Sequence, residues 1–144
     1  MRLAQIMAQP NHDAQRQIIN TEMIVLKDNQ LVSISKAFAV DIVNTCSDLK
    51  ESKKVNVLVN QLLRSGTSIG ANIHEANYAA SRADFVNKLQ IALKECYETD
   101  YWLSLLHDTN HLPDNAFQDL FAQCSKLRKL LIASITTAKK NSEK

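Results

Sequence analysis

Apolar residues recur along most of the chain at intervals of three and four positions, which is the spacing of one face of an α-helix. This pattern predicts four helices, over residues 31–49, 54–78, 82–108 and 114–139. The connections between them are short, beginning with a charged turn at residues 50–54, and short connections favour antiparallel neighbours. The sequence therefore predicts an all-α fold, an antiparallel four-helix bundle with up-down-up-down topology.

The two ends of the chain do not share this pattern. Residues 1–29 are polar and mixed, and Pro10 together with the polar residues 11–13 interrupts the periodicity. We expect residues 1–29 to form an N-terminal appendage that is flexible or loosely docked on the bundle. Residues 30–140 are expected to form the bundle itself, and residues 141–144 a frayed C-terminal tail.

The segment 61–76 contains both glycines of the chain, Gly66 and Gly70, yet it has the periodicity of a helix, with Gly66 on the apolar face. A glycine inside a helix costs about 1 kcal/mol relative to alanine, so its place on this face indicates a close approach of another helix. The alternative is a phosphate-binding loop. That motif requires a Lys-Ser/Thr pair after its last glycine, whereas Ala71 and Asn72 follow Gly70.

Local signals mark the limits of two helices. Ser81 is placed to cap the helix over 82–108, and Asp84 stands where the acid of a capping box reaches back. Pro113 suits the first turn of the last helix, and Asp114 lies near its positive end.

The segment 61–76, QLLRSGTSIGANIHEA, closely resembles the signature of the bacterial "four helix bundle protein" family, first known from open reading frames in intervening sequences of large-subunit ribosomal RNA genes. Residues 84–103 resemble the third helix of that family, and residues 35–49 resemble its first. The resemblance covers roughly residues 30–138. It implies a four-helix subunit with no established enzymatic activity.

The resemblance also implies an assembly, because the family forms homopentamers. A distantly similar protein, the accessory protein of diversity-generating retroelements, is a basic pentameric barrel that binds nucleic acid and a reverse transcriptase. Within this chain, Val40 and Val43 project away from the apolar face of the first helix, which favours a contact between subunits. We therefore expect a homo-oligomer.

The formal net charge of +2 hides an uneven distribution. Residues 95–125 contain six acids and no Lys or Arg, which gives a local charge of −6. Residues 126–144 contain six bases and one acid, Glu143, which gives +5. Such asymmetry describes surfaces and partners rather than the fold.

Five bases of the last helix form the candidate nucleic-acid-binding site. On a helical projection, Lys126, Lys129 and Lys140 form a stripe of positive charge without nearby acids. Arg128 and Lys139 lie near the edge of this stripe. A ring of subunits would repeat this stripe and engage a phosphate backbone. A solvated helix face explains the stripe equally well. Aromatic residues do not interleave with it, so base stacking is not implied.

Four charged residues are candidates for a structural polar network: Arg64, Glu75, Glu95 and Glu98. Glu95 and Glu98 flank Trp102, the only tryptophan, and acids beside a large aromatic side chain need a partner when they are buried. Arg64 is the expected partner. The alternative is a polar patch that binds a ligand, but an arginine balanced by acids offers little field to a phosphate.

The sequence offers no convincing catalytic or metal site. Cys46, Cys96 and Cys124 are odd in number and far apart, which is typical of buried thiols in a reducing compartment. A carboxylate di-metal site needs Glu-x-x-His motifs, but Glu95 is followed at that spacing by Glu98. His107 and His111 have metal-ligand spacing, but they fall where the helix ends. We expect no metal, no cofactor and no enzymatic activity.

These observations predict a cytoplasmic protein, since no apolar run is long enough to span a membrane or resembles a signal peptide. The first hypothesis is a non-enzymatic oligomer that binds structured RNA or DNA through basic helix surfaces. The alternative is an oligomeric scaffold that presents the acidic surface of its third helix to a protein partner.

Overall fold

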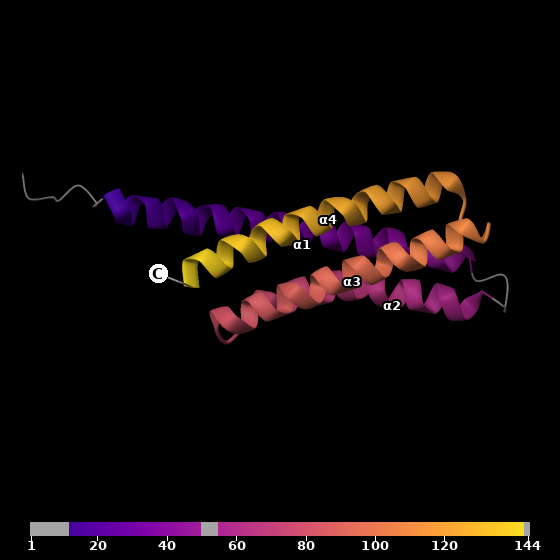
Figure 1. The fold of residues 1–144 in the computed structure, drawn as a ribbon, viewed down its shortest axis with the longest axis horizontal. Coiled ribbons are helices and arrows are strands. Elements are labelled where there is room, and N and C mark those ends of the chain that lie inside the picture. Colours follow the sequence, from indigo (N-terminus) through magenta and orange to yellow (C-terminus); the bar gives the residue numbers. More distant parts are fainter. Residues whose placement is uncertain (1–11, 50–54, 143–144) are drawn as a thin grey trace, which may run out of the picture.

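The computed structural model describes residues 12–49 and 55–142, and over these residues the secondary structure consists of helices without strands. The four helices are α1 (His12–Leu49), α2 (Asn56–Ala76), α3 (Arg82–Asp108) and α4 (Asp114–Ser142). Successive helices run in opposite directions (Figure 1). The all-α, up-down-up-down prediction is confirmed, while the predicted turn at residues 50–54 lies outside the described residues.

The helices close into a ring around one core. Each helix packs against its neighbours in the chain, and α1 also packs against α4; within the described residues the diagonal pairs α1–α3 and α2–α4 make no close contact. The side chains at the centre are mostly branched aliphatic residues from all four helices. The largest that are fully buried include Leu31, Phe38, Ile42, Leu62, Ile69, Leu89, Leu103, Leu106, Leu127 and Leu131.

The predicted start of the first helix at residue 31 is wrong, because α1 begins at His12. Residues 14–30 contain no glycine or proline that would end a helix, and Asp13 lies in the first turn, where a negative charge is favourable. At 1.5 Å per residue, the 38 residues of α1 span about 57 Å. The N-terminal end of α1 extends beyond the other three helices (Figure 1).

The two glycines of α2 lie where the helix approaches α1 most closely. A Cβ atom on Gly66 would stand 2.9 Å from Cγ1 of Ile42, and a Cβ atom on Gly70 would stand 3.3 Å from the backbone oxygen of Ser35. Both glycines lie within α2, and neither has a positive φ. The prediction that they are packing residues within a helix is confirmed.

The ends of α3 follow the local signals in the sequence. The backbone N–H of Asp84 donates to Oγ of Ser81 at 3.1 Å, and the Asp84 carboxylate accepts from the N–H of Ala80 at 3.2 Å. The helix ends at Asp108, as predicted.

The last helix is longer than predicted, since α4 continues to Ser142 rather than ending at residue 139. Lys139 and Lys140 lie in its last turn, where positive charge is favourable at the negative end of the helix dipole. The start of the expected frayed tail is therefore helical, and residues 143–144 lie outside the described part of the chain.

Candidate nucleic-acid interface

The outer face of α4 presents four lysines to solvent: Lys126, Lys129, Lys139 and Lys140. None of the four has an ion-pair or hydrogen-bond partner among the residues that the structure describes. With a rise of 1.5 Å per residue, Lys126 and Lys140 stand about 21 Å apart along the helix axis, a length of roughly six base pairs. We call these four residues the lysine stripe.

Arg128, the fifth predicted binding residue, has a different environment. Its guanidinium forms an ion pair with Asp100 of α3, and Nη2 donates to Oγ of Ser125 at 3.3 Å. The side chains of Arg128 and Asp100 are 21% and 17% exposed. Burial raises the pKa of Asp100, opposed by contacts with Cys124 and Arg128. The expectation of a stripe without nearby acids is therefore wrong for Arg128, which points toward α3.

Arg64 of α2 lies against two acids of α3. Its Nη1 is 3.4 Å from Oε2 of Glu95, and its Nη2 forms an ion pair with Oε1 of Glu98. The indole N–H of Trp102 donates to the same oxygen of Glu98 at 3.2 Å. Burial raises the pKa of Glu95, and the charge of Arg64 counteracts this shift. The Arg64 side chain is 47% exposed, so the cluster lies at the surface.

Glu75, the fourth member of the predicted network, does not join this cluster. It follows Arg64 by eleven residues on α2, which is about 16 Å along the axis. Its carboxylate instead accepts from Nζ of Lys88 at 2.8 Å, and this contact raises the pKa of Lys88. The structure thus brings together Arg64, Glu95 and Glu98, and places Glu75 in a separate exposed pair.

The remaining acids of residues 95–125 also have partners within the subunit. Nε2 of His107 is 2.5 Å from Asp114, and Nδ1 of the same ring is 3.6 Å from Asp108. Asp119 accepts from the amide of Gln123 at 3.0 Å. All six acids of the segment therefore have a partner. Arg64 is the partner of two of them, and Arg128 is the partner of a third. Three of the six acids thus pair with an arginine and the other three contact His107 or Gln123, whereas the lysine stripe has no partner among the described residues.

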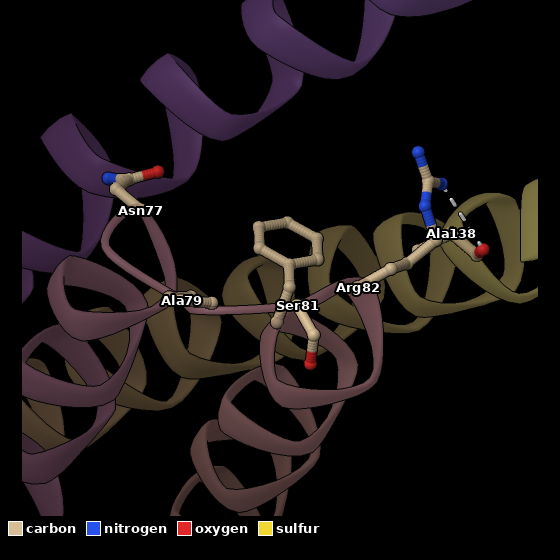
Figure 2. Close-up of a pocket in the computed structure, with 7 residues that line it drawn as sticks. Asn77, Ala79, Ser81, Arg82 and Ala138 are labelled. Carbon is tan, nitrogen blue, oxygen red and sulfur yellow. Dashed lines mark hydrogen bonds between the residues drawn. The ribbon is translucent and has the colours of Figure 1, made fainter.

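A small cavity lies where the turn between α2 and α3 meets the end of α4 (Figure 2). It has a volume of about 370 Å³ and includes Asn77, Ser81, Arg82 and Phe85 in its lining. The guanidinium of Arg82 extends to the backbone oxygen of Ala138 at 3.5 Å (Figure 2). Sequence reasoning missed Arg82. The antiparallel order of α3 and α4 was the available signal, since it brings the start of one helix beside the end of the other.

A larger groove of about 590 Å³ runs between α1 and α2. Residues of the segment 61–76 form one wall, and the groove combines small side chains with polar ones. Its lining consists of Val32, Ser35, Lys36, Ala39, Thr67, Gly70, Ala71, His74 and Glu75.

The three cysteines are buried, as predicted, and none of them forms a disulfide. The Cys124 thiol donates to the backbone oxygen of Cys96 at 3.4 Å, and this neighbour together with burial raises the pKa of the thiol. A raised pKa disfavours the nucleophilic thiolate. Within residues 12–49 and 55–142, no three His, Cys, Asp or Glu side chains are grouped as metal ligands would be. None of the described helices has the length and apolar character needed to cross a bilayer.

Fold and surface together define the class of protein: an all-α four-helix bundle with a basic outer helix. The 23S rRNA-intervening sequence protein family matches residues 27–133, and this chain belongs to that family. The resemblance drawn from residues 61–76 is thereby confirmed.

A solved relative shares this fold. It is a Bacteroides thetaiotaomicron protein of unknown function from the S23 ribosomal protein family, with 49% sequence identity and a TM-score of 0.73. The similarity covers 76% of this chain and 98% of the relative. No curated protein matches the chain.

Proposed function

We propose that this protein is a non-enzymatic, oligomeric nucleic-acid-binding protein that holds structured RNA or DNA by its phosphate backbone. The observation that carries this proposal is the contrast between paired acids and unpaired lysines. The acids of α3 have partners within the subunit, whereas Lys126, Lys129, Lys139 and Lys140 are exposed and without partners in the described part of the chain. A polyanion provides the missing partner.

Recognition by these lysines is electrostatic. A lysine is a flexible point charge that binds phosphate without reading the base, so the stripe selects for charge and shape rather than for sequence. Each phosphate contact releases about one counterion, and the four lysines of one subunit therefore contribute up to about 4 to the slope of log affinity against log salt. Arg82, beside the end of α4, extends the basic surface to the adjacent turn.

We further propose that the subunits assemble, with five as the number that the family resemblance implies. Val40 and Val43 of α1 and Val57 of α2 are exposed apolar residues, which supports a contact between subunits. Assembly would repeat the lysine stripe around an axis, and several stripes acting together bind far more tightly than one. The buried thiols accord with a reducing compartment, so we place the protein in the cytoplasm.

A protein scaffold remains the second candidate. In that function the acids of α3 would attract a partner, but the pairing of Glu95 and Glu98 with Arg64 and of Asp100 with Arg128 weakens the field they present. The groove between α1 and α2 is the feature that favours this candidate, because it offers a concave surface to another chain.

The first test is purification without nuclease, followed by light scattering and the ratio of absorbance at 260 and 280 nm, at low and high salt. The proposal expects an oligomer that carries nucleic acid at low salt and loses it at high salt. A clean oligomer that also fails to retain added RNA or DNA at low salt would favour the scaffold. A monomer would contradict the proposed assembly.

A further inference from the structure

Two exposed tyrosines, Tyr97 and Tyr101, lie one turn apart on α3, and a basic residue of α4 lies over the ring of the first. We propose that this surface stacks unpaired bases, so that the protein prefers nucleic acid with single-stranded segments. The tyrosine surface, as we call it, consists of Lys94, Tyr97, Tyr101 and Arg128. This inference rests on the proposed function and specifies its ligand.

The sequence places no aromatic residue among the bases of the last helix, and the structure shows one from another helix beside Arg128. Tyr97 belongs to α3, so its position beside Arg128 of α4 is not visible in the sequence of either helix. The guanidinium of Arg128 lies over the ring of Tyr97, 5.5 Å from its centroid. Since Lys129 follows Arg128 in the chain, one residue of the lysine stripe lies close to the tyrosine surface.

The tyrosine rings are exposed to solvent, yet each ring contacts a neighbouring side chain. Tyr97 and Tyr101 are 54% and 60% exposed, a high value for large aromatic residues. Arg128, which holds the ring of Tyr97, is itself fixed by Asp100 and Ser125. The ring of Tyr101 meets that of Trp102 edge to face, with centroids 5.0 Å apart. Rings held in this way lose little freedom when a base stacks on them.

The spacing of the rings fits an extended strand. Residues four apart lie on the same face of a helix, about 6 Å along its axis. Bases stacked in a duplex are about 3.4 Å apart, so successive bases meet both rings only when the strand is unstacked.

The charges around the rings favour nucleic acid over a protein partner. Lys94 is exposed one turn before Tyr97, and Lys129 is exposed on the other helix. Lysine is depleted from the centres of protein interfaces, because its burial there requires desolvation of the charge. Aromatic rings between basic side chains are instead typical of single-strand binding, where the rings stack bases and the charges follow the phosphates.

The test compares two ligands of equal length, an oligothymidylate of about twelve nucleotides and the matching thymidylate–adenylate duplex. Both are titrated against the full chain at one low salt concentration. The variant Tyr97→Leu/Tyr101→Leu keeps apolar side chains but removes the rings, and Tyr97→Phe/Tyr101→Phe keeps the rings. We expect the leucine variant to lose roughly tenfold or more in single-strand affinity. Its duplex affinity and the single-strand affinity of the phenylalanine variant should change little.

The unaltered protein supplies a second measurement. Trp102, the only tryptophan, touches Tyr101, so a base stacked there should change its fluorescence more with the single strand than with the duplex. Equal responses to both ligands, or an unchanged affinity of the leucine variant, would overturn the inference while leaving the proposed function intact. A leucine variant that no longer assembles in light scattering would identify the surface as a subunit contact and also overturn it. If neither ligand binds the unaltered protein, the proposed function itself fails.

Discussion

Charged side chains are arranged differently in two regions of the molecule, the contact between α2 and α3 and the outer face of α4. At the first, Arg64 lies between Glu95 and Glu98, and opposite charges meet within the subunit. On the second, four lysines of one sign face solvent and have no partner in the described part of the chain. Opposite charges that meet in one subunit hold helices together, whereas unpaired charges of one sign are available to a ligand.

Reversal of two lysines should give the largest effect. In Lys126→Glu/Lys129→Glu, two phosphate contacts are replaced by repulsion, and we expect affinity for nucleic acid to fall about a hundredfold or more at low salt. The neutral variant Lys126→Ala/Lys129→Ala should lower the salt slope by about 2 per subunit. Titration of a labelled nucleic acid at several salt concentrations measures both quantities.

The matched control carries the same change in net charge on another helix. Arg16 and Lys36 are exposed on α1, and Arg16→Glu/Lys36→Glu should retain nearly all of the affinity. Equal losses in the two variants would mean that net charge, rather than the lysine stripe, determines binding. Light scattering and circular dichroism should find all variants assembled and folded.

Arg128 should behave as a structural residue although it lies between the lysines of α4. Arg128→Ala leaves the mostly buried Asp100 without its cation, and we expect the free energy of unfolding to fall by about 2 kcal/mol. Binding should weaken only modestly. Urea denaturation of Arg128→Ala, Asp100→Ala and the double variant gives the coupling energy of the pair. Additive single changes would contradict a direct interaction.

Arg64 should contribute less, because its side chain is about half exposed and water screens its charge. We expect Arg64→Ala to lower the free energy of unfolding by about 1 kcal/mol, or to weaken assembly if the cluster meets another subunit. The exposed pair of Glu75 and Lys88 is the control, and Lys88→Ala should change stability by less than that. A variant of Arg64 unchanged in both properties would exclude a structural role.

The sequence predicts well those features that depend on residues close together in the chain. The limits of α3 follow from the capping pair Ser81 and Asp84 and from Pro113, and the exposure of the lysine stripe follows from helical periodicity. The start of α1 was missed because the residues after Pro10 are polar and show no clear helical periodicity, although they are helical from His12 onward. Periodicity alone does not locate a helix end.

Features that depend on two helices were harder to predict. A helical projection of α4 places Arg128 near the lysines. Only the packing of α3 against α4 reveals that Arg128 forms an ion pair with Asp100. Likewise, Arg82 reaches the end of α4, and Tyr97 of α3 lies beside Arg128 of α4, through tertiary contacts. Facing residues are set by how the helices rotate against each other, which one sequence does not specify.

The smallest expected effect concerns acid pH. Burial raises the pKa of Glu95 above 4.5 and that of Asp100 above 3.8. A carboxyl group with a higher pKa in the folded chain binds its proton more tightly when folded, so its protonation favours folding. Protonation of the two carboxyl groups therefore stabilises the folded chain at low pH. This stabilisation is lost as pH rises from the ordinary pKa values of these groups through their higher pKa values in the folded chain.

Thermal unfolding measured from about pH 4 to 7 should therefore show Glu95→Gln and Asp100→Asn losing less stability across that window than the unaltered protein. A greater loss in both variants would mean that the partners Arg64 and Arg128, rather than burial, dominate the two carboxyl groups.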